Sequence, residues 1–365
     1  MTDRQFTPPS PRRSLANPDL WRPSSHDGDV RSLDLLWLDR GECIDPELTN
    51  LAASLLREIP PETIFGYPVP GPLYRKLAKH LGLDTDNLLL TRGSDGAIKT
   101  VFEAYVEPGD MVVISQPSYQ MYGVYAKIFE ARVHPVPYSL VDGCPVITAK
   151  SMIEAIREAR PKLVGLPNPD NPTGFAFSEA EMRTIIETAG EVGALILVDE
   201  AYYPFLEQTC LGWVKEYGHL IVARTFSKAW GMAGIRLGYT AASPEITTML
   251  NKVRTMIEAD GPAMALAEKM LDHQDAVDAS LKRLRQGRAF FAQEMKALGY
   301  HAIETPCNFI HVDFGDNRKK IEQALANITT YRLFPVPPLE NFIRFTTTTS
   351  ELFRPVIEAI RAATT

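Results

Sequence analysis

The stretch "RTFSKAWGMAGIRLGYT", residues 224–240, decides the fold because it joins an apolar strand end to a lysine set among small residues. Lys228 follows Thr-Phe-Ser, a turn rich in Gly and Ala comes next, and Arg236 lies eight residues further on. An amine at the edge of a sheet and close to other cations can have a lowered pKa and act as a nucleophile. A lysine after a strand is, taken alone, more often a solvated charge, so the surrounding segments must decide.

Short apolar runs alternate with segments of helical periodicity between about residues 48 and 245. The runs predicted as strands are 87–91, 110–115, 162–166, 194–200, 219–225 and 235–242. The segments predicted as helices include 48–59, 72–82, one that begins with Ser94 and Asp95 as cap residues, 119–131, 148–159 and 178–192. Strands that are apolar on both faces and separated by helices predict an α/β fold with a mostly parallel sheet covered on both sides.

The chain after residue 245 has a different pattern. Helical segments around 262–298 lead to strand candidates at 308–314 and 341–348 and then to a terminal helix. We therefore predict three parts: an N-terminal arm (1–34), a large domain (48–245) and a smaller α+β domain (35–47 plus 246–365). The arm is rich in Pro and Ser and is expected to be disordered or draped over a neighbour.

Composition narrows the classes of partner. The chain has 365 residues, is 45% hydrophobic and 23% charged, and carries a formal net charge of −7. A negative surface repels nucleic acid and anionic membranes, so we expect neither as a partner. No apolar run approaches the ~20 residues of a membrane span, and the N-terminus has no apolar core that could serve as a signal peptide.

Cysteine and histidine usage points to a cytoplasmic protein without a metal. The four cysteines (Cys43, Cys144, Cys210 and Cys307) are far apart and form no CxxC pair, which suits a reducing cytoplasm. The seven histidines show no HExxH or other metal-ligand spacing, so no protein-bound metal is predicted.

Several strand ends carry polar residues, and parallel strands direct such residues into one crevice. Gly93, Ser94, Asp95 and Gly96 stand at a strand-to-helix turn, where free N–H groups and the helix dipole form an anion cradle. An ordinary capped helix would have the same sequence. Tyr119 follows the next strand and could stack on a planar ligand, although core packing explains an isolated aromatic equally well.

Two further strand ends complete the set. The turn "LPNPDNPTG" (166–174) is too rich in proline to continue a strand, and it can hold the Asn171 amide in place as a donor. Asp199 and Glu200 end the apolar run "ILVDE", and a carboxylate at that depth needs a cation or hydrogen-bond donors. A protonated ring nitrogen of a cofactor would serve, and so would a structural arginine.

The order of these features is more specific than any one of them. They match the parts of one cofactor, pyridoxal 5′-phosphate (PLP). The anion turn suits its phosphate, the aromatic its ring face, the asparagine turn its ring oxygen and the strand-end aspartate its ring nitrogen. Lys228 suits its aldehyde, and Arg236 can supply a second clamp on an anion.

The same residues carry a resemblance to a known family. "PNPDNPTG", "VDEAY" and "TFSKAWGMAGIRLGY", supported by "YP…LYRKLA" and "GSDGAIK", resemble fold-type-I PLP aminotransferases of class I/II, and above all histidinol-phosphate aminotransferases. The likeness covers about residues 35–362. It implies a mostly parallel seven-stranded sheet between helices, a smaller α+β domain, and transfer of an amino group between an amino acid and a 2-oxo acid.

The resemblance also implies roles for single residues. Lys228 would bind the cofactor aldehyde covalently and later carry the substrate proton, and Asp199 would pair with the pyridinium nitrogen. Asn171 and Tyr202 would hydrogen-bond the ring oxygen, and Tyr119 would stack on the ring. The phosphate would be held by Ser94, Asp95, Gly96, Thr225, Ser227 and Arg236.

The implied substrate and assembly residues lie elsewhere in the chain. Arg344 would take the substrate α-carboxylate as a bidentate fork. Arg332 would meet a phosphate on the substrate side chain, or it is a surface charge on an edge strand. Tyr67 would reach the phosphate of a second subunit, which implies a homodimer with shared active sites.

The sequence departs from the family at two places. The segment that usually reads N-E-N-P-Y/F-G-P is "LDRGECIDPEL" (38–48) here, and only Glu42 and Pro46 match it. The position after Asp95, often acidic in the family, is Gly96. The substrate pocket is therefore expected to differ, and an anionic side chain on the substrate is favoured by Arg332. A decarboxylase of the threonine-phosphate type on the same cofactor, a PLP-sensing regulator and a plain α/β binding protein remain the alternatives.

Overall fold

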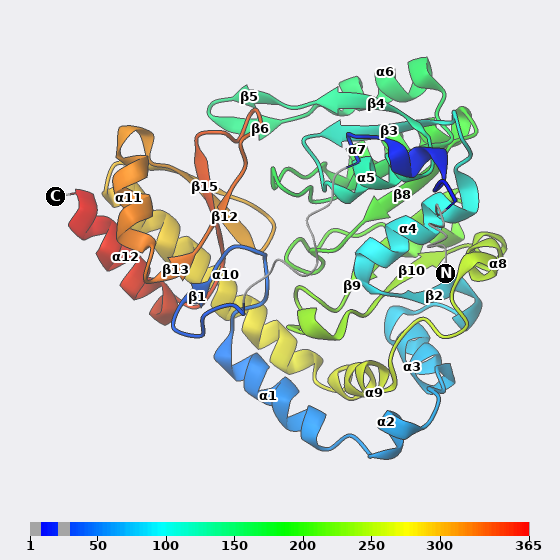
Figure 1. Ribbon diagram of the computed structural model, residues 1–365, viewed down its shortest axis with the longest axis horizontal. Coiled ribbons are helices and arrows are strands. Elements are labelled where there is room, and N and C mark those ends of the chain that lie inside the picture. Colours follow the sequence, from blue (N-terminus) through cyan, green and yellow to red (C-terminus); the bar gives the residue numbers. More distant parts are fainter. Residues whose placement is uncertain (1–8, 21–29, 365) are drawn as a thin grey trace, which may run out of the picture.

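The computed structural model of the chain describes residues 9–20 and 30–364. Its largest element is a seven-stranded sheet (Figure 1) with the strand order β2-β10-β9-β8-β7-β3-β4. The strands are β2 (Leu88–Thr91), β3 (Met111–Gln116), β4 (Arg132–Pro137), β7 (Leu163–Pro167), β8 (Leu195–Asp199), β9 (Leu220–Thr225) and β10 (Gly238–Ala242). Only β10 runs antiparallel to its neighbours within this sheet. The predicted mostly parallel α/β fold is thereby confirmed.

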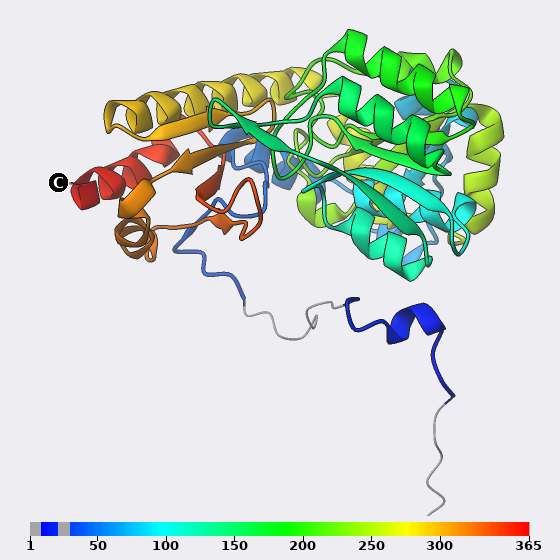
Figure 2. The same ribbon diagram turned by 90° about the horizontal axis from the view of Figure 1, so that it is seen from above.

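Helices cover both faces of the sheet, as Figure 2 shows. Alternate residues of one strand enter different cores: Ile196 and Val198 of β8 lie in one hydrophobic cluster, Leu195 and Leu197 in the other. One face is covered by α4 (Gly93–Tyr105), α5 (Met121–Ile128) and α8 (Pro244–Val253). The other packs with α1 (Pro46–Arg57), α3 (Gly71–Leu81), α6 (Ala149–Ala159), α7 (Glu179–Glu191) and α9 (Gly261–Met270).

A second, antiparallel sheet lies at the other end of the molecule, with the order β11-β12-β15-β14. Its strands are β11 (His301–Glu304), β12 (Phe309–Asp313), β15 (Phe342–Thr346) and β14 (Arg332–Leu333). Helices α11 (Arg318–Leu325) and α12 (Ser350–Thr364) pack with it around a separate hydrophobic cluster. β1 (Leu36–Trp37) pairs with β13 (Thr329–Thr330) next to this unit.

The helix α10 (Gln274–Ala297) joins the two units, and Figure 1 shows it running from the small unit towards α9 of the large one. Val277 and Leu284 near its start belong to the core of the large sheet, whereas Phe291 and Met295 near its end belong to the core of the small one. The spacing of these apolar residues keeps one face of a single helix buried in both cores.

Some local predictions are wrong. Ser94 and Asp95 do not cap α4, because the helix already begins at Gly93, its N-cap residue is Arg92, and no side chain caps it. The strand predicted over 235–242 begins only at Gly238, because Ala233–Ile235 form a 3-10 turn and Arg236 takes a left-handed conformation with φ +52°. The sequence pattern also missed α8 and the hairpin of β5 (Ser139–Val141) and β6 (Cys144–Val146).

The described part of the N-terminal arm lies against α5. Arg12 Nη2 donates to the carbonyl of Ile128 at 3.2 Å, and Lys127 Nζ donates to the carbonyl of Asp19 at 2.9 Å. From its sequence, the arm is expected to be disordered or draped over a neighbour. Its residues 1–8 and 21–29 lie outside the described residues. No helix in the described parts is both long and apolar enough to span a bilayer.

Candidate active site

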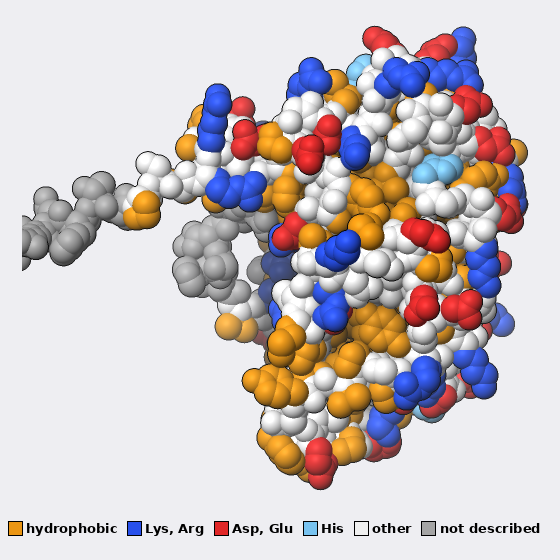
Figure 3. All heavy atoms as spheres, turned by 90° about the vertical axis from the view of Figure 1, so that its right-hand side faces the viewer, with side chains coloured by type: hydrophobic (Ala, Val, Ile, Leu, Met, Phe, Trp, Pro, Cys, Tyr) orange, Lys and Arg blue, Asp and Glu red, His pale blue; other side chains and the backbone are white. Residues whose placement is uncertain are grey.

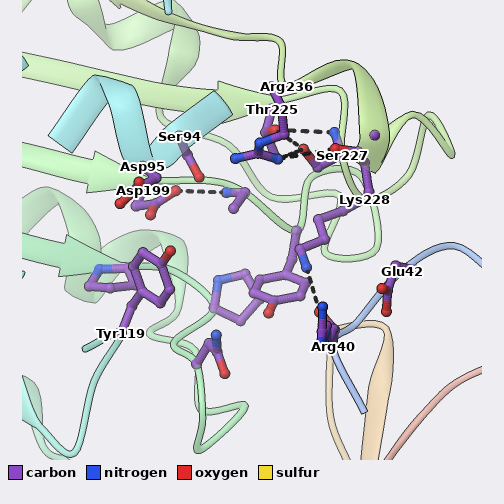
Figure 4. Close-up of a pocket in the computed structure, with 17 residues that line it drawn as sticks. Arg40, Glu42, Ser94, Asp95, Tyr119, Asp199, Thr225, Ser227, Lys228 and Arg236 are labelled. Atoms are coloured by element: carbon purple, nitrogen blue, oxygen red, sulfur yellow. Dashed lines mark hydrogen bonds between the residues drawn. The ribbon is translucent and has the colours of Figure 1, made fainter. Parts of the chain in front are cut away.

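A cavity of about 420 Å³ opens at the carboxyl ends of the parallel strands, where the large sheet faces the segment around residue 40 (Figure 4). Polar ligand sites are expected at this edge of an α/β sheet. Most of the predicted site residues line it: Ser94, Asp95, Tyr119, Asn171, Asp199, Tyr202, Thr225, Ser227, Lys228 and Arg236. Gly96, Tyr67, Arg332 and Arg344 do not.

Lys228 projects from the loop after β9 towards the segment 40–42 (Figure 4). Its Nζ donates to the carbonyls of Arg40 at 3.1 Å and Gly41 at 3.0 Å. Burial lowers the pKa of Lys228 to about 8, and the positive charges of Arg344 and Arg236 act in the same direction. A larger fraction of the amine is therefore neutral near physiological pH than for an ordinary lysine, and the neutral form is the nucleophile.

Asp199 and Glu200 are adjacent but have different partners. Glu200 forms a buried ion pair with Arg224, whose Nη2 lies 2.8 Å from Glu200 Oε2. Asp199 accepts one hydrogen bond, from the amide of Ala201 at 3.0 Å, and no cation pairs with it in the described part of the chain. Burial, reinforced by Asp170, raises its pKa to about 7. The structural arginine thus belongs to Glu200, and Asp199 faces the cavity.

One end of the cavity is built to receive an anion. The amino end of α4 lies there with Ser94 and Asp95 in its first turn. Arg236 Nη1 donates to Ser227 Oγ at 3.3 Å, and Thr225 Oγ1 donates to Ser227 Oγ at 2.9 Å.

Gly93 leaves the space that this anion cradle needs. Its φ is +69°, and a Cβ atom at this position would stand 3.0 Å from Arg236 Nη2. The amide of Gly96 donates to the carbonyl of Arg92 inside the helix, so the structure does not bring this residue to the cradle.

The opposite side of the cavity is formed by Tyr119, Tyr202 and Asn171. Tyr202 is buried beside Lys228, whose Nζ lies 5.7 Å from the centre of the tyrosine ring. Asn171 Oδ1 accepts from Arg344 Nη1 at 2.7 Å. Arg344 therefore lies directly behind the cavity although it does not line it.

A buried carboxylate that sequence reasoning missed holds this side together. Asp170 accepts hydrogen bonds from the hydroxyls of Ser115, Ser118 at 2.8 Å and Tyr138 at 2.9 Å. These donors come from the ends of β3 and β4, so Asp170 ties the loop that carries Tyr119 to the loop that carries Asn171. The only signal in the sequence is an acidic residue inside a proline-rich turn.

Arg344, Arg332 and Tyr67 have different environments. Arg344 is buried and forms no ion pair with an acidic side chain of the described chain. Arg332 lies directly across from it in the β14–β15 register but is exposed on the edge strand. Tyr67 is 86% exposed in a single chain.

The residues present fit PLP. The anion cradle, the buried Asp199 and the Lys228 amine line one cavity, and they are the groups that the phosphate, ring nitrogen and aldehyde of one PLP molecule require. Arg40 and Glu42 also line the cavity, and they belong to the 38–48 segment that departs from the family pattern.

Comparisons with known proteins agree with this geometry. Residues 34–360 match the family model "Aminotransferase class I and II". The chain is 34% identical over 298 residues to a histidinol-phosphate aminotransferase of Symbiobacterium thermophilum, covering 80% of each chain. It is 35% identical over 283 residues to histidinol-phosphate aminotransferase 1 of Burkholderia lata, covering 76% of this chain and 78% of that one.

Solved structures show the same fold. The histidinol-phosphate aminotransferase of Sinorhizobium meliloti in complex with pyridoxal-5′-phosphate superposes with a TM-score of 0.79, 24% identity and 90% coverage of both chains. Aspartate aminotransferase from Thermus thermophilus with maleate has a TM-score of 0.74 and 20% identity, and the match covers 90% of this chain and 92% of that one. With the family match over nearly the whole chain, the cavity around Lys228 places this chain among the class I and II aminotransferases, the PLP-dependent enzymes of fold type I.

Proposed function

We propose that the chain transfers amino groups to and from substrates that carry an anionic group, with Lys228 as the reacting amine and Asp199 as the partner of the ring nitrogen. When bound, PLP supplies an aldehyde that joins covalently to amines and a ring that accepts electrons. The observation that carries the proposal is the pairing pattern at residues 199 and 200. Arg224 neutralises Glu200, and Asp199 is buried beside the cavity with no cation of the described chain paired to it.

Lys228 performs two tasks in this proposal. Its neutral amine would hold the cofactor aldehyde covalently, and once a substrate amine has taken its place, the same nitrogen would be free to take the proton from the substrate Cα. A pKa of about 8 allows both, because the amine is partly neutral at physiological pH and still basic enough to accept the proton. The carbonyls of Arg40 and Gly41 hold this nitrogen at the substrate side of the cavity.

Asp199 keeps a proton on the cofactor ring. A carboxylate without another cation pairs strongly with a pyridinium in a buried site, because the low dielectric raises the cost of leaving either charge alone. Tyr119 and Asn171 orient the ring, and the cradle of Ser94, Ser227 and Arg236 binds the phosphate.

The substrate proposal rests on Arg344. A buried guanidinium without a carboxylate partner is expected to bind one from a ligand. Arg332 opposite it favours a phosphate, and histidinol phosphate, whose anionic group is a phosphate, is the first candidate because curated relatives carry that name. The carboxylate at Arg344 would come from the amino acid or 2-oxo acid of the other half-reaction. Arg40 and Glu42 give this chain its own pocket wall, so other amino acids with an anionic side chain are included.

We also infer a homodimer that completes the site. Ile64, Phe65, Tyr67 and Val69 are each at least 77% exposed. Figure 3 shows hydrophobic side chains gathered at the lower end of the molecule, where α2 (Glu62–Phe65) lies. An apolar surface of this kind is typical of an interface, and the partner's Tyr67 would then reach the phosphate.

A panel of amino donors tests the activity and the substrate class. The purified holoenzyme is mixed with single amino donors, histidinol phosphate and L-glutamate among them, and absorbance spectra follow the change of the cofactor from its aldehyde to its amine form. We expect donors with an anionic group to react fastest, with the 2-oxo acid or ketone that corresponds to each donor as product. Release of CO₂ without a keto product would identify a decarboxylase and overturn the proposal.

A further inference from the structure

Arg344 has a neighbour of complementary chemistry that the site described above does not use. His311 lies directly opposite Arg344 in the antiparallel register of β12 and β15, so both side chains are on one face of the small sheet. That face meets the proline-rich turn of the large sheet. Arg344 Nη1 donates to Asn171 Oδ1 at 2.7 Å, and His311 Nε2 is 2.7 Å from the carbonyl of Pro172.

The contact with Pro172 fixes the tautomer of His311. A carbonyl oxygen only accepts, so Nε2 must carry the hydrogen. Burial and the charge of Arg344 lower the pKa of His311 to about 3, which keeps the ring neutral. Nδ1 is therefore an acceptor, and it is buried without a hydrogen-bond partner among residues 9–20 and 30–364.

Arg344 has the matching unpaired donor. Its Nη2 donates to the carbonyl of Asp39 at 2.9 Å and its Nη1 to Asn171, whereas Nε is buried and has no partner in the part of the chain that the structure describes. The guanidinium carbon lies 4.8 Å from the ring centre of Phe309 and 4.9 Å from that of Phe334. Because these rings flank the group and Nε is closed to solvent, a ligand can reach only the Nη end, and a partner for Nε must come from the protein.

We propose that His311 is a positioning residue for Arg344: its Nδ1 accepts the Nε–H when a substrate carboxylate binds the Nη end. The inference rests on the proposed role of Arg344. Anchored by Pro172, the imidazole fixes the orientation of the guanidinium and thereby affects binding of the carboxylate rather than the chemistry at Lys228. The variants His311→Phe, His311→Asn and His311→Gln separate the contribution of Nδ1 from that of the contact with Pro172.

The test measures binding of a dicarboxylate to the holoenzyme and the kinetics of L-glutamate. Maleate is titrated against the cofactor absorbance of wild type and variants. His311→Phe keeps an aromatic ring but removes both nitrogens, and we expect its Kd for maleate and its KM for glutamate to rise about tenfold, the effect of losing one hydrogen bond to a charged group. The kcat at saturating glutamate should stay within about twofold, because transition-state contacts at Lys228 are unchanged.

Two conservative variants separate the role of Nδ1 from packing. His311→Asn places an amide oxygen near the position of Nδ1 and should recover most of the maleate affinity. His311→Gln reaches Pro172 but offers nothing at Nδ1, so it should behave like His311→Phe, and this pair decides the question if the phenylalanine variant fails to fold. The control is His219→Phe. His219 stands just before β9 and does not line the cavity, and its Nε2 makes a similar 2.8 Å contact with a backbone carbonyl, that of Ile186.

The outcomes distinguish this inference from the proposed function. Unchanged maleate affinity in His311→Phe, or equal losses in the asparagine and glutamine variants, overturns the role of His311. Arg344→Met is measured in parallel: if this variant binds maleate as tightly as wild type, the carboxylate role of Arg344 fails, and with it the basis of the inference.

Discussion

Arg224 pairs with Glu200, and its neighbour in the sequence, Asp199, has no cationic partner among the described residues. The Arg224 guanidinium carbon also lies 3.5 Å from the ring centre of Tyr203, on the side away from the cavity. Alternation along the end of β8 sends one carboxylate to each side of the sheet. The two acidic residues of "VDEAY" are thereby separated into Glu200, which forms a buried ion pair, and Asp199, which lines the cavity.

This separation predicts that neutralising Asp199 lowers activity, whereas neutralising Glu200 lowers stability. Asp199→Asn removes the charge that holds a proton on the ring, and we expect transamination to fall about a thousandfold while the protein stays folded. Glu200→Gln leaves Arg224 as an uncompensated buried cation, and we expect the free energy of unfolding to fall by about 3–5 kcal/mol. Steady-state kinetics and urea unfolding of both variants check this. An Asp199→Asn enzyme with wild-type turnover would contradict the assignment.

The lowered pKa of Lys228 predicts how covalent cofactor binding depends on pH. Only the neutral amine attacks an aldehyde, and the folded-state pKa of Lys228 is lowered to about 8. The rate of covalent PLP capture by cofactor-free protein should therefore level off above pH 8 and fall about tenfold per pH unit below it. Borohydride trapping followed by mass spectrometry measures the captured fraction. Lys228→Ala is the control and should capture none at this site; a rate that is independent of pH would sink the prediction.

The raised pKa of Asp170 predicts that the stability of the folded protein depends on pH. Burial raises its pKa from 3.8 to about 7, so the folded protein binds this proton more tightly than the unfolded chain does. The corresponding stabilisation is complete below about pH 4 and is lost as the pH rises through about 7.

The isosteric variant Asp170→Asn cannot lose a proton. It should therefore gain stability relative to wild type between pH 4 and 7 in urea unfolding of cofactor-free protein. Asp170→Ala, which leaves three hydroxyls without their acceptor, should instead lose about 1–3 kcal/mol at every pH. An identical pH profile in wild type and Asp170→Asn would refute the argument.

Much of the site could be predicted from the sequence because it depends on strand ends. Asp199, Lys228 and Asn171 each follow an apolar run, and parallel strands bring such positions to one edge whatever their separation in the chain. Arg344 could be placed only through the family resemblance, because its strand belongs to another sheet.

The features that were missed depend on non-local geometry. Asp170 meets its donors because β4, β3 and β7 are neighbours in the sheet, and strand order is not written in any local pattern. Helix α4 begins at Gly93, a residue with positive φ and no side chain that could cap the helix, whereas Ser94 and Asp95 looked like cap residues in the sequence. The pairing of Glu200 with Arg224 likewise needs the β8–β9 register, which hydrophobic periodicity does not give.

Two glycines of similar conformation test the anion cradle. Gly93 and Gly82 have φ values of +69° and +65°, but a Cβ at Gly93 would stand 3.0 Å from Arg236 Nη2, whereas nothing lies within 4 Å of one at Gly82. Alanine at either position should cost about 1–2 kcal/mol of stability for the left-handed backbone. Only Gly93→Ala should also weaken PLP binding, by about tenfold or more, because it displaces the phosphate-binding arginine. Fluorescence titration with PLP measures this, and equal affinities in the two variants would count against the cradle.

The exposed apolar side chains at α2 predict the oligomeric state. Phe65 is 80% exposed and Tyr67 86%, and burying such groups against a second copy would remove apolar surface from water. We expect wild type to sediment as a dimer and Phe65→Asp as a monomer, since a charge at this position would be buried without a partner. Leu140→Asp, at a 52% exposed position on the distant β5–β6 hairpin, should remain dimeric. Tyr67→Phe should keep the dimer but bind PLP more weakly, because only the hydroxyl that would reach the partner's phosphate is lost. A wild-type protein that stays monomeric at micromolar concentrations and still transaminates would show that one chain holds the complete site.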